Sequence, residues 1–172
     1  MFWECQMKEI RFKGKAIHIK GVLPKVGSSA PSFELVGQDL SPISLASFGN
    51  KRKILNIFVS LDTSVCSKSI HTFNTEVKGI SDLIVINISM DLPFAASRFC
   101  KSENIDNVVT LSAFRSTFPE DYGVKIIDGP LEGLCARAVL TLGKDNKVLY
   151  TELVPEITQE PDYQAAIKSF NF

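Results

Sequence analysis

The sequence predicts an α/β protein in which helices flank a central mixed sheet. Two segments, KILNIFV (residues 53–59) and LIVINISM (residues 83–90), are nearly continuous in apolar and β-branched residues, as is typical of strands buried on both faces. Each is followed by a segment with helical features, and a hairpin pattern comes late in the chain. Strands that alternate with helices favour a parallel core, to which a late hairpin adds antiparallel strands.

The N-terminal part is predicted to be mainly β-structure. IRFKG and AIHIKG are short, β-prone segments joined by a turn of glycine and lysine, which predicts a hairpin. SFELVG and SPISLASF are expected to form further strands. After the first buried strand, SIHTFNTEVKGI carries apolar residues at helical spacing, namely Ile70, Phe73, Val77 and Ile80.

The C-terminal part continues the alternation. Pro93 suits the first position of a helix over PFAASRFCKSEN, which is expected to end near Cys100. VVTL predicts a short strand, and Pro119 limits helix length in FRSTFPEDYGV. RAVLTL and KVLYTELV flank Gly-Lys-Asp-Asn and predict a hairpin, and DYQAAIKSF predicts a final helix. This order indicates a thioredoxin-like fold with an added N-terminal β-hairpin.

Length and charge restrict the class of protein. The chain has 172 residues, which fits a single domain over residues 8–172 preceded by an N-terminal extension of residues 1–7. Basic and acidic residues number 19 each, so neither nucleic acid nor an anionic membrane is expected as the main partner. No apolar run reaches the roughly 20 residues of a membrane span. The N-terminus lacks the apolar core of a secretory signal, so a cytoplasmic location is the simplest expectation.

The four cysteines do not form a familiar structural pattern. They are too sparse for a disulfide-stapled secreted domain, and no CxxC motif occurs. With only His18 and His71 in addition, their spacing does not suit a zinc site. The thiols are therefore expected to be free in a reducing compartment. Cys135 is expected to pack in the core, and Cys5 to be an exposed thiol of the extension.

Cys66 is the cysteine whose position asks for a chemical explanation. It lies in VSLDTSVCSKS, several residues after the first buried strand and in the first turn of the next predicted helix. The unpaired N–H groups and the dipole at a helix N-terminus favour a thiolate over a thiol. The alternative is a small buried side chain that packs as a hydrophobe. A helix terminus contributes only about 1 kcal/mol to a nearby anion, so a reactive Cys66 also needs an arginine and a hydroxyl donor such as Thr63.

Longer motifs resemble one enzyme family. LNIFVSLDTSVC, SMDLPFAASRFC, the FR of SAFRSTF, DGPLEGLCARAVL and VPEITQEPDYQAA are similar to the thiol peroxidases, the atypical two-cysteine subfamily of the peroxiredoxins. The resemblance runs from about Lys8 to Phe170. The patterns SMDLPFAxSRFC and EPDYxAA are specific to this subfamily, and the separation of Cys66 and Cys100 matches that of its two redox cysteines.

The resemblance implies a thiol-specific peroxidase that reduces hydrogen peroxide and alkyl hydroperoxides in antioxidant defence. Cys66 would be the peroxidatic cysteine and Cys100 the resolving one, with Thr63 and Arg137 at the thiolate. Cys66 would become a sulfenic acid and then form an intramolecular disulfide with Cys100, which thioredoxin would reduce. This cycle implies no metal, haem or other cofactor. The resemblance also implies a homodimer.

The resemblance further implies a conformational change. A disulfide requires Cα atoms within about 7 Å of each other. One thiol in the first turn of a helix and another near the end of a second helix are not expected to lie that close. The first turn after Cys66 and the segment around Cys100 are therefore expected to unwind on oxidation.

One residue departs from the family motif, which has proline where this chain has Val59. Proline would fix φ and remove a backbone N–H beside the thiolate, whereas valine does neither. Val59 is expected to line the substrate pocket together with Phe58 and Leu61. The departure keeps open an alternative, a redox sensor or catalytically weak scaffold on the same fold. A disulfide oxidoreductase is disfavoured because the chain has no CxxC motif.

Overall fold

The two strands predicted from the apolar runs form the centre of the sheet. The computed structural model describes residues 6–171. Strand β5 (Arg52–Ile57) pairs in parallel with β6 (Leu83–Ser89), with Asn56 opposite Asn87 in the register. Helix α1 (Ser64–Glu76) connects the two strands, because parallel neighbours require a crossover.

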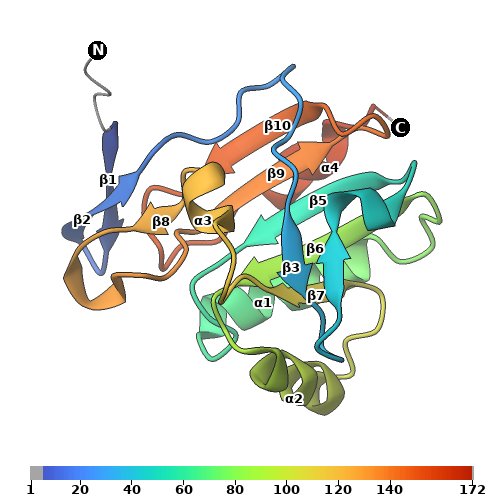
Figure 1. The fold of residues 1–172 in the computed structure, drawn as a ribbon, viewed down its shortest axis with the longest axis horizontal. Coiled ribbons are helices and arrows are strands. Elements are labelled where there is room, and N and C mark those ends of the chain that lie inside the picture. The colour runs from blue at the N-terminus through green and yellow to red at the C-terminus, as the bar shows by residue number, and fades with distance from the viewer. Residues whose placement is uncertain (1–5, 172) are drawn as a thin grey trace.

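The main sheet has seven strands in the order β10–β9–β5–β6–β7–β3–β4 (Figure 1). Strand β7 continues the parallel core beside β6, while β9 pairs antiparallel with β5. The predicted mixed sheet and late hairpin are therefore confirmed. The remaining strands of this sheet are β3 (Glu34–Val36), β4 (Pro42–Ser44), β7 (Val109–Ser112), β9 (Ala138–Leu142) and β10 (Val148–Leu153).

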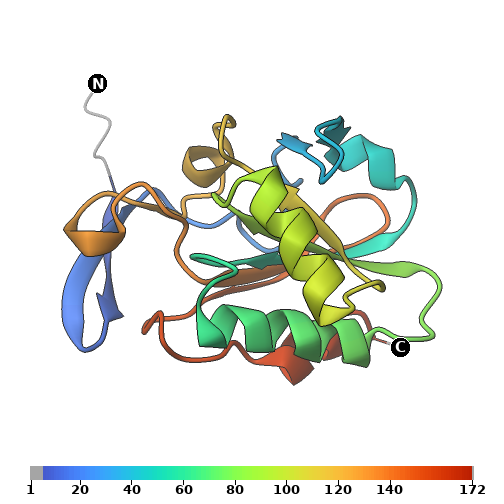
Figure 2. The same cartoon turned by 90° about the horizontal axis from the view of Figure 1, so that it is seen from below.

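Helices cover both faces of the sheet, as the sequence predicts. Helices α1 and α4 (Tyr163–Lys168) lie on one face (Figure 2), where Phe73 and Ala166 pack with Ile54 in an apolar cluster. Helix α2 (Pro93–Glu103) packs against β7. The short helix α3 (Phe118–Asp121) lies on the opposite face, where the ring of Phe118 stacks on that of Tyr122 at a centroid distance of 4.2 Å.

Two element boundaries differ from the sequence expectations. Helix α2 begins at Pro93 but continues past Cys100 to Glu103, because Asn104 caps it in the left-handed conformation (φ 54°). The second half of SPISLASF was expected to be a strand, yet Leu45–Phe48 forms a 3-10 helix (η1). Ser44 and Ser47 form a capping box there, and this local hydrogen bonding favours a helix start over a strand.

The predicted N-terminal hairpin forms a second, smaller sheet. Strands β1 (Met7–Phe12) and β2 (Lys15–Lys20) pair antiparallel, and β8 (Lys125–Ile126) adds a third strand that was not predicted (Figure 1). The 3-10 helix η2 (Gly129–Leu131) follows β8. Strand β1 begins one residue before the expected domain boundary. Cys5 and most of the expected extension lie outside the described residues.

Glu156 fastens the tip of this hairpin to the segment that follows β10. Its carboxylate accepts hydrogen bonds from the backbone N–H groups of Lys13 at 3.1 Å and Gly14 at 3.0 Å, and from Thr158. Burial acts to raise the pKa of Glu156, but these hydrogen bonds outweigh it and lower the pKa to about 2. The ionised carboxylate therefore holds the hairpin in place through the physiological pH range.

We expect Glu156→Gln to loosen the hairpin tip, because the amide NH₂ turns a donor toward backbone donors. Hydrogen exchange at the amides of Lys13 and Gly14 should become about tenfold faster. In the wild type the contribution of Glu156 is complete above its ordinary pKa of 4.5 and is lost as the pH falls from 4.5 toward about 2. Unchanged exchange in the variant would show that the carboxylate does not hold the tip.

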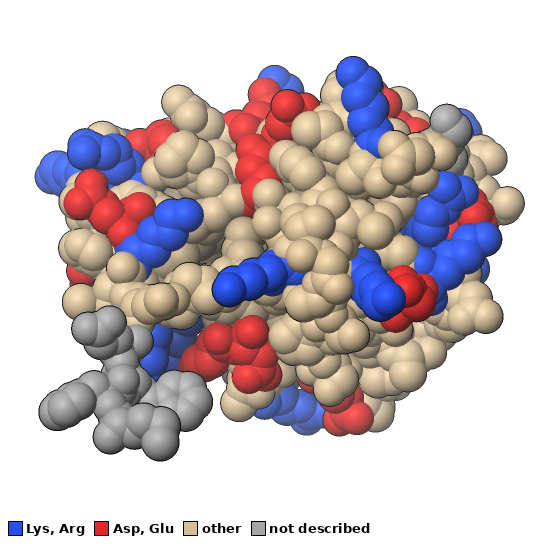
Figure 3. Space-filling view, turned by 90° about the horizontal axis from the view of Figure 1, so that it is seen from above, with Lys and Arg blue, Asp and Glu red and all other residues tan. Residues whose placement is uncertain are grey.

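The surface agrees with the neutral charge balance. Basic and acidic side chains are interspersed on the face shown in Figure 3. Within residues 6–171, every helix is too short or too polar to cross a membrane.

Candidate active site

Cys66 is the third residue of α1, and its side chain is completely buried. The loop that leads from β5 into α1 is fixed by Asp91, which follows β6. The carboxylate of Asp91 accepts hydrogen bonds from the Ser60 hydroxyl and from the N–H of Leu61, each at 2.8 Å. This carboxylate was not singled out in the sequence, although its place after a buried strand, beside the Cys66 loop, is a usable signal. The loop thereby fixes the position of the first turn of α1, which contains Cys66.

Arg137 is the side chain that contacts the Cys66 sulfur. It precedes β9, is 1% exposed, and its Nη2 donates to Cys66 Sγ at 3.1 Å. Its Nε donates to the carbonyl of Ile157 at 2.9 Å, which fixes the guanidinium plane. A buried guanidinium requires an anionic partner to offset the cost of desolvation. Cys66 Sγ is the side-chain atom that this guanidinium contacts.

A second donor of Arg137 is left over for a substrate. Nη1 is buried and has no hydrogen-bond partner within the described chain. Arg137 also lines a cavity of about 300 Å³ beside Cys66. The cavity is mostly apolar, with walls from the β1–β2 hairpin, the α1 entry loop and the segment after β10; its other lining residues are Phe12, Lys13, Val59, Thr63, Ser64, Val65, Leu131, Ile157 and Thr158. A small polar group that enters this cavity therefore lies next to the Arg137 side chain.

Thr63 lies at the rim of this cavity as the N-cap residue of α1. Its hydroxyl donates to the carbonyl of Ser60 at 3.0 Å, and no hydrogen bond joins it to Cys66 among the described residues. Because this hydroxyl donates to Ser60, its oxygen can accept a hydrogen bond from a bound molecule. The structure thus brings Thr63 and Arg137 to one cavity, and of these two residues Arg137 is the one hydrogen-bonded to the sulfur.

The three residues expected to form the substrate pocket separate in the structure. Val59 lines the cavity at Arg137. Phe58 is fully buried in the core, and Leu61 lines a different groove, between α1 and α2, together with Arg98 and Phe99. Phe58 and Val59 are successive residues that leave β5 and point to opposite sides, whereas Leu61 lies beyond the bend at Val59, in the turn before α1.

We expect Val59→Pro to increase the rate constant for reaction with peroxide. The backbone N–H of Val59 has no acceptor within residues 6–171, so proline removes no hydrogen bond there. Proline also restricts the backbone at the cavity wall and lowers the entropy cost of ordering it. We expect a gain of about two- to fivefold in stopped-flow measurements. An unchanged or lower rate constant would mean that valine carries no functional cost.

Cys100 occupies a separate environment. It is 7% exposed, and its Sγ lies 3.5 Å from the Thr110 hydroxyl in β7 and accepts from Gln38 Nε2 at 3.4 Å. Both Cys66 and Cys100 are free thiols. Cys66 contacts Arg137, which precedes β9, whereas Cys100 contacts Thr110 in β7. Strands β5 and β6 lie between β9 and β7 in the sheet. A disulfide between the two cysteines therefore requires a local rearrangement.

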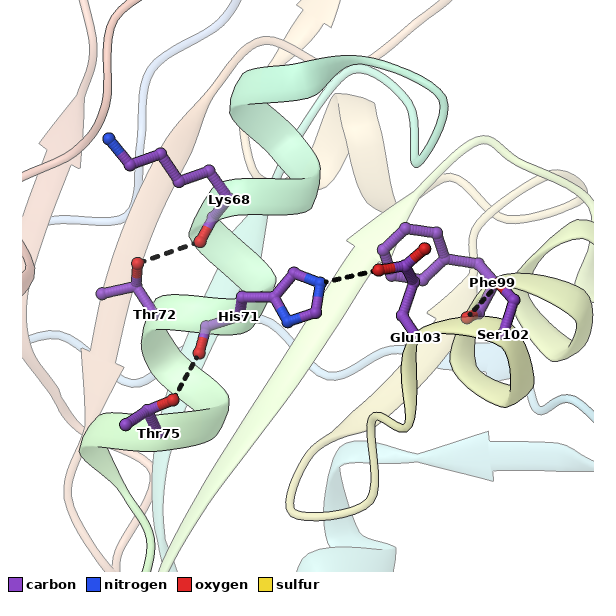
Figure 4. A network of polar contacts seen from close by, with 7 residues as sticks. All are labelled: Lys68, His71, Thr72, Thr75, Phe99, Ser102 and Glu103. Carbon is purple, nitrogen blue, oxygen red and sulfur yellow. Dashed lines mark hydrogen bonds and ion pairs between the residues drawn. The ribbon is translucent and has the colours of Figure 1, made fainter.

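The two helices that carry these cysteines are joined at the surface. His71 Nε2 of α1 lies 3.1 Å from Glu103 Oε2 at the end of α2, and the ring of Phe99 lies beside the imidazole (Figure 4). The hydroxyls of Thr72 and Thr75 donate to backbone carbonyls one turn earlier in α1. The contact between His71 and Glu103 is a polar link between α1 and α2.

Cys135 is buried in the core, two residues before Arg137. Its side chain is completely inaccessible, and burial raises the pKa of its thiol to about 12. A thiol of this kind stays protonated and does not react as a nucleophile. The expectation that Cys135 packs in the core is confirmed.

Comparisons with known proteins identify the family. Residues 25–167 match the Redoxin family model. The chain is 53% identical over 161 residues to the thiol peroxidase of Mycobacterium tuberculosis (strain ATCC 25618 / H37Rv), covering 94% of this chain and 97% of that protein.

Solved structures of similar proteins agree with this family assignment. A peroxiredoxin-like protein from Aquifex aeolicus is 40% identical with a TM-score of 0.89 over 96% of this chain and 98% of its own. A thiol peroxidase from Chromobacterium violaceum shares the fold, with 24% identity and a TM-score of 0.89 over 95% of each chain. The chain belongs to the redoxin family and, within it, to the thiol peroxidases.

Proposed function

We propose that the protein reduces hydrogen peroxide and alkyl hydroperoxides with Cys66 as the attacking residue. One observation carries this proposal: Arg137 Nη2 lies 3.1 Å from the buried Cys66 Sγ, while Arg137 Nη1 remains free beside a cavity. The positive charge and the N-terminus of α1 both favour the thiolate. The same guanidinium then stabilises negative charge on the departing oxygen.

The first step oxidises one sulfur by two electrons. The Cys66 thiolate attacks the nearer peroxide oxygen and the O–O bond breaks. The second oxygen leaves with a proton as water or alcohol, and Cys66 becomes a sulfenic acid. Arg137 and Thr63 orient the peroxide, and the apolar part of the cavity accommodates an organic substituent.

The second step uses Cys100. The Cys100 sulfur attacks the sulfenic acid sulfur, the proton of the Cys100 thiol joins the departing hydroxyl to form water, and a disulfide joins Cys66 to Cys100. A dithiol protein of the thioredoxin type restores both thiols by exchange. We further propose a homodimer that works in the cytoplasm, where such reductants keep thiols reduced.

A thiol titration tests this proposal. One equivalent of peroxide should remove two free thiols, and peptide mapping should recover a Cys66–Cys100 disulfide. Cys100→Ser should lose one thiol in the same reaction and should stop after a single turnover with thioredoxin. Loss of thiols at other positions would contradict the assignment.

The chief alternative is a redox sensor on the same fold, since Val59 departs from the family motif. Both readings give the same disulfide in the titration. Continuous peroxide consumption with thioredoxin and its reductase distinguishes them, because a sensor turns over slowly or stops. Sustained turnover supports the enzyme.

A further inference from the structure

A row of buried polar side chains crosses the centre of the sheet. Asn56 in β5, Asn87 in β6 and Thr110 in β7 are register partners, and each is at most 2% exposed. Asn56 Nδ2 donates to Asn87 Oδ1 at 2.9 Å, and Asn87 Nδ2 donates to the Thr110 hydroxyl at 3.4 Å. Two residues earlier in the same strands, on the same face of the sheet, Ile54 and Val85 are apolar. We call Asn56, Asn87, Thr110 and Ser69 the polar ladder.

The two ends of the polar ladder reach the two redox cysteines. At one end Asn56 Nδ2 donates to the Ser69 hydroxyl at 3.3 Å, and Ser69 donates to the backbone carbonyl of Cys66 at 2.8 Å. At the other end Cys100 Sγ donates to the Thr110 hydroxyl at 3.5 Å. An unbroken chain of hydrogen bonds therefore joins the first turn of α1 to the thiol of Cys100.

Stability alone does not account for this arrangement. Central strands of a parallel sheet are ordinarily apolar on both faces. Asn56 Oδ1 is buried and accepts no hydrogen bond from the described residues, which costs stability. Apolar side chains of similar size would fill the same space without that cost.

We propose that the polar ladder holds both cysteine segments in the arrangement of the reduced protein and thereby sets the rate of the resolving step. Forming the disulfide removes the Cys100 S–H group that donates a hydrogen bond to Thr110, and it displaces the turn that Ser69 anchors. The ladder must therefore break before Cys100 can reach Cys66. Its members are positioning residues, and this inference rests on the proposed function of both cysteines.

The ladder then controls a competition at the Cys66 sulfenic acid. In one outcome Cys100 attacks, water leaves and the disulfide forms. In the other, a second peroxide transfers an oxygen to the sulfenic acid, leaves as water or alcohol, and produces a sulfinic acid. A stronger ladder keeps Cys100 away for longer and increases the sulfinic fraction at a given peroxide concentration.

Thr110→Val tests this link, because valine keeps the shape and removes the oxygen that Cys100 and Asn87 share. We expect disulfide formation to become about fivefold faster, and about fivefold more peroxide to be needed for half-conversion of Cys66 to sulfinic acid. The rate of the first oxidation should stay within twofold of the wild type. Thr110→Ser keeps the oxygen and should keep the wild-type partition of Cys66 between disulfide and sulfinic acid.

Thr141→Val is the matched control. Thr141 is also completely buried, and its hydroxyl contacts Ser169 at 2.6 Å, away from both cysteines. The Thr141→Val variant loses a buried hydroxyl through the same substitution, and its partition between disulfide and sulfinic acid should equal that of the wild type. Ser69→Ala, at the opposite end of the ladder, should shift the partition in the same direction as Thr110→Val.

Mass spectrometry of Cys66 after a peroxide titration reads out the partition, and stopped-flow fluorescence gives the two rates. An equal shift in Thr141→Val, or no shift in Thr110→Val while the wild type forms its disulfide, would overturn the role of the ladder. If the wild type forms no Cys66–Cys100 disulfide, the proposed function itself fails, which is a distinct result.

Discussion

Replacing Cys66 with serine is expected to reduce peroxide consumption to the background rate, a loss of at least about a thousandfold. A serine hydroxyl stays protonated next to Arg137, and its oxygen cannot accept the peroxide oxygen as a sulfur does. The loss should appear in the second-order rate constant for peroxide from stopped-flow measurements. It should be the same for hydrogen peroxide and for an alkyl hydroperoxide, because both require the same sulfur.

Cys135→Ala is the matched control for this loss. It removes another fully buried cysteine, whose pKa is raised to about 12 by burial. The variant should retain the wild-type rate constant, although its stability should fall by about 1 kcal/mol because a small cavity forms. Activity that survives in Cys66→Ser and disappears in Cys135→Ala would contradict the assignment.

The second large effect is expected at Arg137. Arg137→Met keeps the length and apolar stem of the side chain and removes the charge that contacts Cys66 Sγ at 3.1 Å. The rate constant for peroxide should fall by about 10²–10³, the usual loss when a preorganised donor to a developing charge is removed. Stopped-flow oxidation of Cys66 at neutral pH measures this loss directly.

Arg137→Lys separates charge from geometry. Lysine restores a positive charge but cannot bond the Ile157 carbonyl and Cys66 together as the guanidinium does. Its rate constant should lie between those of Arg137→Met and the wild type. Thermal unfolding of each variant checks that the fold is retained. A wild-type rate constant in a folded Arg137→Met protein would show that this arginine has no part in the reaction.

Much of the fold could be predicted from local pattern. The apolar runs around Leu55 and Ile86 predict the central strands, and Pro93 predicts the start of α2, because burial and backbone chemistry act over a few residues. The predictions were wrong for the end of α2 and for the segment at Leu45, which forms a 3-10 helix and not a strand. Both depend on weak capping interactions of Asn104 and Ser44, which compete closely with other local structures.

The site was less accessible to such reasoning. A helix terminus identifies Cys66 as a candidate, but Arg137 is distant in the sequence and was assigned only through family resemblance. The fold brings the two together because β9 pairs with β5, from which the Cys66 loop departs. Asp91 and the Asn56–Asn87 pair were missed. The signal for the asparagine pair is a polar residue at equivalent places in two neighbouring apolar strands, and it becomes meaningful only once the register is known.

The most direct test of the account is to locate the atom that peroxide oxidises. Cys100→Ser protein is treated with one equivalent of peroxide in the presence of dimedone, which traps sulfenic acids, and the label is mapped by mass spectrometry. We expect the label on Cys66, and we expect Arg137→Met in the same background to slow its appearance. A label on Cys135, or peroxide consumed with Cys66 unmodified, would contradict this expectation.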